Sequence, residues 1–244
     1  MRISVCIATF NGQEYIEEQL LSILNQLEDK DEIIISDDGS TDSTIEICNK
    51  FKDSRIKIFF NEDKLKHSPN INKATKNFEN AINKSSGELI FLCDQDDIWY
   101  ENKVQIIKQI YSTSNFLCLV HDATIINSSG DIIESSYFNK INSGPGIFKN
   151  LISNSFLGCS MVFSKKVKNR ILPFPKELHA HDMWIGLISQ YYSKVFFLKE
   201  PLIYYRRHSK NVTNSGYKSS NPLNYKINYR LKFLFQFIAR ILKF

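Results

Sequence analysis

The chain has 244 residues, of which 43% are hydrophobic and 23% charged, a composition that suits one continuous α/β core. The net charge is +5, but residues 1–217 are nearly neutral and the positive excess lies after them. This distribution excludes nucleic acid as a partner. Apolar runs fall short of the ~20 residues of a membrane span, and five scattered cysteines argue against disulfides or a zinc site, so we expect a cytoplasmic protein.

The first hundred residues alternate between two kinds of pattern. Continuous apolar runs predict strands at 3–8, 32–36, 56–60 and 89–93. Amphipathic periodicity predicts helices at 13–27, from about 44, and at 72–84. Because strands that are apolar on both faces need cover on both, the alternation predicts an α/β fold with a Rossmann-like, mostly parallel sheet and helices on both faces.

The rest of the body has a mixed pattern. The predicted elements are a helix (103–111), a strand (116–121), a hairpin near 127–130, an irregular stretch (139–145), a strand (156–164), a short helix (165–171), a helix (182–192) and a strand (195–198).

Residues 213–244 form a basic amphipathic tail. Six basic residues and no acid follow residue 217, which leaves 25 basic and 26 acidic residues before them. One predicted helical face carries apolar side chains (Ile227, Leu231, Leu234, Ile238, Ile241, Leu242), and the other carries basic ones (Lys226, Arg230, Lys232, Arg240, Lys243). This pattern favours a helix that lies on an anionic membrane surface; docking on the body or on a partner subunit is the alternative.

Polar loops follow three of the predicted strands. Thr9 and Asn11 follow the first, Asp37 and Asp38 follow the second, and residues 94–97 (Asp-Gln-Asp-Asp) follow the fourth. Because ligands bind at the carboxyl ends of strands in such sheets, we expect these loops to form one site.

The loop at 94–97 is the densest of the three in charge. Asp94, Asp96 and Asp97 place three carboxylates within four residues, which repel one another unless a positive group is bound. Their hard oxygen atoms suit Mg²⁺ or Mn²⁺ together with phosphate. A solvated acidic turn that caps the next helix is the alternative. Asp37 and Asp38 form a turn in which one carboxylate would accept the imide N–H of a pyrimidine base.

Two later segments add candidate groups. Asp182 opens a predicted helix, either as its cap or as a general base that takes a proton from a hydroxyl. Arg206 and Arg207 suit phosphate contact, and His208 would ligate a metal or hydrogen-bond a diphosphate. An ordinary basic surface segment is the alternative for these three residues.

Together these residues resemble the glycosyltransferase family 2 enzymes, which have the GT-A fold. Three motifs carry the likeness, which covers about residues 2–212: Val5–Asn11, Ile35–Asp42 and Phe91–Trp99. The resemblance implies a nucleotide-sugar-binding half (1–112) and an acceptor-binding half (113–212) of one domain.

The resemblance also implies roles for single residues. Thr9 and Asn11 would line the nucleotide pocket, with Asp38 or Asp37 on the base, Asp94 near the ribose or metal, and Asp96 on the metal. Asp182 stands at the position of the general base, although His181-Asp182 replaces the common Glu-Asp pair. The sugars would contact Gly158, Cys159, Ser160 and Trp184, and the diphosphate and its metal would contact Arg206, Arg207 and His208.

The implied activity is inverting transfer of a sugar from a nucleotide-diphosphate donor to a saccharide or lipid-linked saccharide. The Asp-Gln-Asp-Asp-Ile-Trp motif looks most like bacterial rhamnosyltransferases of surface polysaccharide synthesis. That implies dTDP-rhamnose or a UDP-sugar as donor, at the inner face of the cell membrane. Two alternatives remain. One is a nucleotidyltransferase, which usually has a glycine-rich, basic loop after its first strand; the loop Thr9–Gly12 has no lysine or arginine. The other is a non-catalytic sugar-nucleotide-binding protein.

Overall fold

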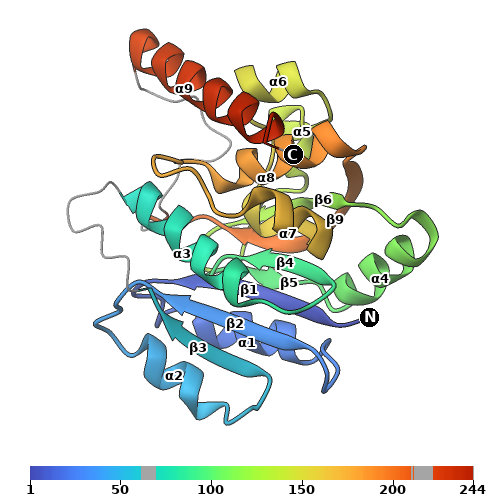
Figure 1. Ribbon diagram of the computed structural model, residues 1–244. Helices are drawn as coiled ribbons and strands as arrows, with labels where there is room; N and C mark the ends of the chain where they lie inside the picture. The colour runs from blue at the N-terminus through green and yellow to red at the C-terminus, as the bar shows by residue number, and fades with distance from the viewer. Residues whose placement is uncertain (62–69, 210, 212–221, 244) are drawn as a thin grey trace.

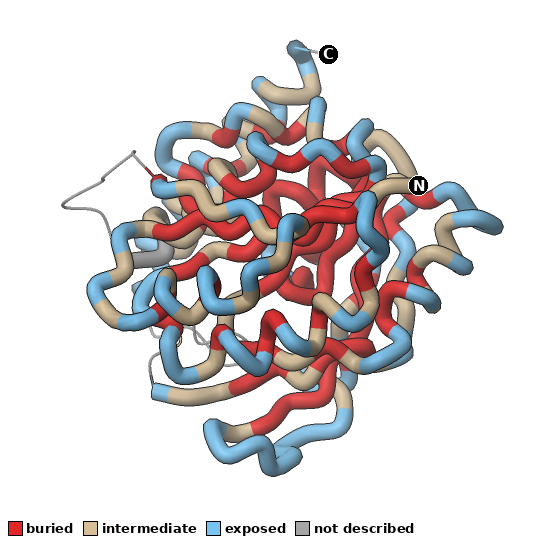
Figure 2. The backbone as a smooth tube through the Cα atoms, turned by 90° about the horizontal axis from the view of Figure 1, so that it is seen from below, coloured by how far each residue is buried: buried red, intermediate tan, exposed pale blue. Residues whose placement is uncertain are grey.

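The computed structural model describes residues 1–61, 70–209, 211 and 222–243. Within these residues a nine-stranded mixed sheet runs through the body. Helices cover both faces of the sheet (Figure 1), and buried residues gather in the interior of the molecule (Figure 2). The start of the basic tail, including Lys218, lies outside the described residues.

The first half of the chain alternates strand and helix as predicted. Its elements are β1 (Ile3–Thr9), α1 (Ile16–Leu24), β2 (Glu32–Asp37), α2 (Thr44–Lys50), β3 (Ile56–Phe60), α3 (Asn70–Lys84), β4 (Leu89–Cys93), β5 (Ile98–Trp99) and α4 (Lys103–Ser114). The chain steps from β1 out to β3 and then returns to β4, so right-handed crossovers place α1 and α2 on one face and α3 on the other (Figure 1).

The second half adds strands to the same sheet. Its elements are β6 (Cys118–Ile126), β7 (Ile132–Glu134), α5 (Tyr137–Ile141), α6 (Ile147–Ile152), a 3-10 turn (Gly158–Ser160), β8 (Met161–Ser164), α7 (Lys165–Ile171), α8 (His181–Tyr192), β9 (Phe196–Arg206) and α9 (Leu223–Ile241).

The strand order explains where a site can form. The order is β3-β2-β1-β4-β8-β6-β9-β5, with β7 paired to β6, and the four strands at its start are parallel. Thr9 lies opposite Asp37, and Ile7 lies opposite Cys93. The loops after β1, β2 and β4 therefore leave the sheet at the same edge, as the sequence predicts.

Three of the differences from the prediction have a local cause. The strand predicted at 156–164 begins only at Met161, because the preceding three residues form a 3-10 turn. The stretch predicted as irregular contains part of α5, a helix of 5 residues that is too short for periodicity to reveal. The strand predicted at 195–198 continues to Arg206 past Pro201, where its register with β6 shifts. A proline inside the run hid that continuation from the sequence pattern.

α9 packs against the body rather than standing apart from it. It contacts α6 and α8, and Phe233 and Phe237 on its inner face are buried. Figure 1 shows this helix at the upper edge of the molecule, next to α6. In the part of the chain that the structure describes, no helix is both long and apolar enough to cross a membrane.

α4 places a lysine in the core. Lys103 is fully buried, with its ammonium 4.0 Å from the centroid of the Trp99 ring and Nζ donating to the Cys159 carbonyl at 3.4 Å. Burial lowers the pKa of Lys103 to about 8, because the charged form loses its hydration.

We expect Lys103→Met to change how stability depends on pH. From about pH 8 to about pH 10 the unfolded lysine keeps its proton while the folded one releases it. The unfolding free energy of the natural chain should therefore rise by roughly 2 kcal/mol relative to that of the variant. Denaturant titrations of both proteins at both pH values measure this difference. Thiols and tyrosines also titrate in this range, but both proteins contain them, so their contributions cancel. Lys50→Met, at an exposed lysine, is the control; parallel profiles for Lys103→Met and the natural chain would contradict the expectation.

Candidate active site

A cavity of about 530 Å³ opens at the carboxyl ends of β1 and β4, between α3 and the start of α8. Eight of the residues predicted for the site line it: Thr9, Asn11, Asp38, Asp94, Asp96, Gly158, Asp182 and His208. The other six lie outside its lining: Asp37, Cys159, Ser160, Trp184, Arg206 and Arg207.

The loop after β2 separates the roles of its two aspartates. Asp37 is buried and accepts hydrogen bonds from the Thr9 hydroxyl at 2.8 Å and from the Ser40 amide at 2.7 Å. Its carboxylate therefore shapes the loop. Asp38 lines the cavity, and its partial burial raises its pKa. Of the two, Asp38 is the residue that a ligand would meet.

The loop after β4 brings a carboxylate and an imidazole together across the sequence. Oδ2 of Asp96 lies 2.8 Å from Nε2 of His208 and accepts a hydrogen bond from Nδ2 of Asn211 at 3.1 Å. Asp94 lines the same cavity, and burial followed by the charge of Asp96 raises its pKa to about 7. These residues concentrate acidic oxygen atoms on one wall.

Asp97 turns away from the cavity into the protein. Its Oδ1 accepts the Arg206 amide at 3.0 Å, and burial, then the charges of Asp96 and Asp94, raise its pKa well above the usual value. This carboxyl group joins the acidic loop to the end of β9 and lies outside the cavity lining.

Arg206 is buried, and its guanidinium binds protein groups. Nε donates to the Asp96 carbonyl at 2.9 Å, Nη1 to the Ser128 carbonyl at 3.1 Å, and Nη2 to the Glu18 carboxylate at 2.6 Å. Arg206 therefore braces the acidic loop from behind. Arg207 donates to the Tyr205 hydroxyl at 2.9 Å, and only the tyrosine of that pair lines the cavity.

Asp182 lies in the first turn of α8, which begins at His181, and it lines the cavity. Its Oδ2 accepts a hydrogen bond from Nδ2 of Asn154 at 3.0 Å, and its Oδ1 accepts the Met183 amide at 2.7 Å. The cap position belongs to Ala180, so Asp182 is not the helix cap.

The 3-10 turn before β8 forms part of the cavity wall through Gly158 alone. A side chain there would collide with the His181 ring, so the backbone can approach only as glycine. Cys159 and Ser160 are buried behind it.

Among the described residues, one cluster has the geometry of a metal site, and it differs from the predicted pair of Asp96 and His208. Asp94, Asp97 and Cys159 place their ligand atoms within 4.8 Å of one another. Burial raises the pKa of the Cys159 thiol well above its usual value, and a protonated thiol is a poor ligand. Asp94 is the member of this cluster that also lines the cavity.

Trp184 belongs to the hydrophobic core. Its side chain is fully buried, Nε1 donates to the Ile171 carbonyl at 3.0 Å, and its ring packs edge-on against Phe233 of α9. This position places the indole away from the cavity and against the C-terminal helix.

Several residues of the site escaped sequence reasoning. Gln95 accepts the Phe10 amide at 2.9 Å and donates to the Phe10 carbonyl at 3.1 Å, which ties the loops after β1 and β4 together. The Tyr15 ring stacks on the His208 ring with centroids 5.0 Å apart. The position of Gln95 inside the acidic loop could have identified it as part of the site. Nothing in the sequence around Tyr15 distinguishes that residue.

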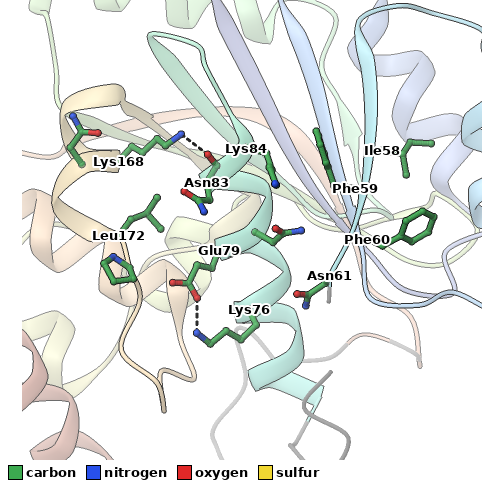
Figure 3. A pocket seen from close by; sticks show the side chains of 13 residues that line it. Ile58, Phe59, Phe60, Asn61, Lys76, Glu79, Asn83, Lys84, Lys168 and Leu172 are labelled. Atoms are coloured by element: carbon green, nitrogen blue, oxygen red, sulfur yellow. Dashed lines mark hydrogen bonds and ion pairs between the residues drawn. The ribbon is translucent and has the colours of Figure 1, made fainter. Parts of the chain in front are cut away.

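A second groove, of about 940 Å³, lies on the other side of α3, between β3 and α7 (Figure 3). Its lysines bind neighbouring protein groups: Lys76 pairs with Glu79 at 2.6 Å, and Lys168 donates to the Asn83 carbonyl at 3.1 Å. These contacts join α3 internally and to α7. None of the residues predicted for the site lies there.

Comparison with known proteins identifies relatives along most of the chain. The model of Glycosyl transferase family 2 matches residues 4–169. The dTDP-rhamnosyl transferase RfbG of Shigella flexneri is 27% identical over 92% of this chain and 77% of its own length. The GalNAc(5)-diNAcBac-PP-undecaprenol beta-1,3-glucosyltransferase of Campylobacter jejuni is 28% identical over 93% of this chain and 72% of its own.

Solved structures share the fold. Staphylococcus aureus TarS 1-349 in complex with UDP-GlcNAc matches with a TM-score of 0.69 at 19% identity, over 98% of this chain and 73% of that one. Another structure of TarS 1-349 matches with a TM-score of 0.64 at 20% identity, over 84% of this chain and 60% of the TarS chain. Glucosyl-3-phosphoglycerate synthase from Mycobacterium tuberculosis, in complex with Mn²⁺, UDP and phosphoglyceric acid, has a TM-score of 0.58 at 16% identity, over 98% of this chain and 78% of that one. The architecture is the expected GT-A fold, and with a family model that matches residues 4–169, the chain belongs to glycosyl transferase family 2.

Proposed function

We propose that this chain is an inverting glycosyltransferase that moves a sugar from a nucleoside-diphosphate donor to a saccharide or lipid-linked saccharide acceptor. The observation that carries the proposal is that Asp182 and the pair Asp94 and Asp96 line one cavity of about 530 Å³. Such a displacement needs a base for the acceptor hydroxyl and carboxylates that can hold a metal ion for the diphosphate.

The loop after β2 supports a donor with a uracil or thymine base. Asp38 lines the cavity beside Thr9, and it accepts a hydrogen bond from Asn61 at 3.2 Å. A carboxylate has enough lone pairs to accept the imide N–H of a pyrimidine as well. RfbG is named for dTDP-rhamnose, and TarS binds UDP-GlcNAc, so the proposed donors are dTDP-rhamnose or a UDP-sugar.

The residues around Asp96 fit a divalent cation. A carboxylate oxygen and an imidazole nitrogen lie 2.8 Å apart at the cavity wall; the carboxylate suits Mg²⁺ or Mn²⁺, and the imidazole nitrogen favours the transition metal Mn²⁺. We assign Asp96 and His208 as the ligands, with Asp94 beside them. A metal bound there would offset the negative charge that develops on the leaving diphosphate.

The chain's own groups position the rest of the reaction. Asp182 takes the proton of the acceptor hydroxyl, and Asn154 holds the carboxylate of Asp182 at 3.0 Å. The deprotonated oxygen attacks the anomeric carbon from the side opposite the diphosphate, and this single displacement inverts the anomeric centre. Arg206 does not touch the diphosphate in this scheme; it holds the acidic loop in place.

The names of relatives supply the acceptor class. The Campylobacter jejuni enzyme acts on an undecaprenol-linked saccharide, and RfbG transfers rhamnose. By analogy, the proposed acceptor is a lipid-linked saccharide of surface polysaccharide synthesis, at the inner face of the cell membrane. A nucleotidyltransferase is less well supported, because the loop after β1 lacks the basic residue that a nucleoside triphosphate needs.

A panel of sugar nucleotides tests the activity. The chain is incubated with dTDP-rhamnose, UDP-glucose or UDP-GlcNAc and Mn²⁺, and release of the nucleoside diphosphate is measured with and without saccharide acceptors. Acceptor-dependent release supports the proposal. Release of pyrophosphate from a nucleoside triphosphate and a sugar phosphate would identify a nucleotidyltransferase, and binding without release would identify a non-catalytic protein.

Asp96→Ala should remove the metal-dependent part of nucleotide binding. Calorimetry of UDP in the presence of Mn²⁺ should show at least about a tenfold loss of affinity, since one good charge-assisted ligand contributes more than about 1.4 kcal/mol. Asp29→Ala, at an exposed aspartate, is the control and should bind normally. Natural affinity in Asp96→Ala would contradict the metal assignment.

Asp182→Asn should abolish transfer and leave donor binding intact. The amide keeps the shape of the carboxylate and its contact with Asn154 but does not accept the acceptor's proton, so kcat should fall by about 10²–10⁴-fold. Single-turnover rates and donor titrations separate the two effects. Asp131→Asn, on the exposed hairpin, should leave both unchanged; turnover of Asp182→Asn at the natural rate would mean that another group is the base.

A further inference from the structure

α9 docks with its basic and aromatic face inward. Phe233 and Phe237 are buried against the body, and Arg240 donates to the Arg170 carbonyl at 2.8 Å and to that of Pro173. Arg230 donates to the Ile152 carbonyl at the end of α6. Two cations that the sequence suggested for an anionic surface are therefore engaged with the body.

One exposed side of α9 is apolar. Its side chains recur every three or four residues, which places them on one side of the helix, and they are widely exposed: Ile227 46%, Leu231 59%, Phe235 74%, Ile238 43% and Leu242 82%. An isolated exposed leucine needs no explanation, but a stripe along a whole helix indicates a surface that something covers.

α6 adds two more exposed apolar side chains beside this stripe. Phe148 is 82% exposed and Ile152 67% exposed, and Arg230 links α6 to α9. Figure 1 shows the two helices next to each other at the same edge of the molecule. We call the exposed apolar residues of these two helices the α6–α9 surface.

This surface adjoins the end of the cavity that holds the proposed base. Asn154, two residues after Ile152, lines the cavity and donates to Asp182. His179, also in the lining, packs against the ring of Tyr229 in α9 with centroids 5.5 Å apart. The chain thus passes directly from the α6–α9 surface to the residues that would receive the acceptor.

We propose that the α6–α9 surface binds the interfacial region of a lipid bilayer and so brings the acceptor end of the cavity to the membrane. Two observations select lipid over another occupant. Residues 222–243 contain no acidic side chain, and the exposed Lys232 and Lys243 lie along one side of the apolar stripe, where Lys232 forms a solvent-exposed pair with Glu177; this charge suits an interface with anionic headgroups. The cavity end beside the surface is the end to which a lipid-linked acceptor would come, so this part of the argument rests on the proposed function.

Vesicle binding tests the proposal without any catalytic step. The natural chain should co-sediment with vesicles of phosphatidylcholine and phosphatidylglycerol in equal parts. Leu231→Gln with Phe235→Gln should lower the apparent affinity at least about tenfold, because both side chains lose their burial in the apolar region and glutamine keeps the helix. The control, Ile132→Gln with Ile133→Gln, removes two exposed apolar side chains from β7, far from α9 in the sequence, and should bind as the natural chain does.

Other outcomes would overturn the proposal. These are failure of the natural chain to bind vesicles, binding that both double variants retain equally, and a dimer in solution that Leu231→Gln with Phe235→Gln dissociates while no vesicle binding is seen. The last would mean that a second copy of the chain covers the surface. Failure of the proposed function is recognised separately: Asp182→Asn should bind vesicles normally, and the α9 variant should keep the natural rate of sugar-nucleotide turnover with a lipid-free acceptor.

Discussion

The interaction on which the site depends is that of Arg206 with the acidic loop after β4. Its amide holds the Asp97 carboxyl and its guanidinium holds the Asp96 carbonyl, across 109 and 110 positions of sequence. The same guanidinium reaches Glu18 at the start of α1. One side chain at the end of β9 therefore joins both halves of the sheet, and it leaves the Asp96 carboxylate facing the cavity beside His208, which follows Arg206 by two residues.

The second constraint is the repulsion between the crowded carboxyl groups of the loop. Each carboxyl group has a different burial and therefore a different charge. Asp96 lines the cavity, where the His208 imidazole and the Asn211 amide contact its carboxylate. Asp97 is buried and its pKa is raised, so the loop does not hold three full negative charges at once. The buried ammonium of Lys103 lies on the protein side of the same region, near Cys159. The loop is thus acidic toward the cavity and close to neutral toward the core, an asymmetry that suits a site for one cation.

The sequence predicted the part of this arrangement that follows from the periodicity of apolar residues and from the polar residues at the strand ends. Parallel strands with polar ends had to bring Thr9, Asp38 and Asp96 to one edge, and they do. It did not separate side chains that face the cavity from those that turn inward, because that depends on the tertiary contacts of each loop. Arg206 suggests a phosphate ligand by residue type, yet its guanidinium binds protein groups that lie 78 or more positions away in the sequence. Lys103, likewise, resembles any lysine of an amphipathic helix.

The C-terminal helix shows how the same limitation extends to surfaces. Its amphipathic pattern establishes that one face is apolar and one is basic, and it leaves open which face meets the body. The carbonyl groups around the end of α7 decide this, because a helix leaves its last carbonyls without intrahelical partners and a cation satisfies them well. Arg240 binds there, and Phe233 packs beside it on Trp184. Once the basic face is held in this way, the apolar stripe must face outward, and the tryptophan that the family resemblance suggested for a sugar contact instead fixes the helix that carries the stripe.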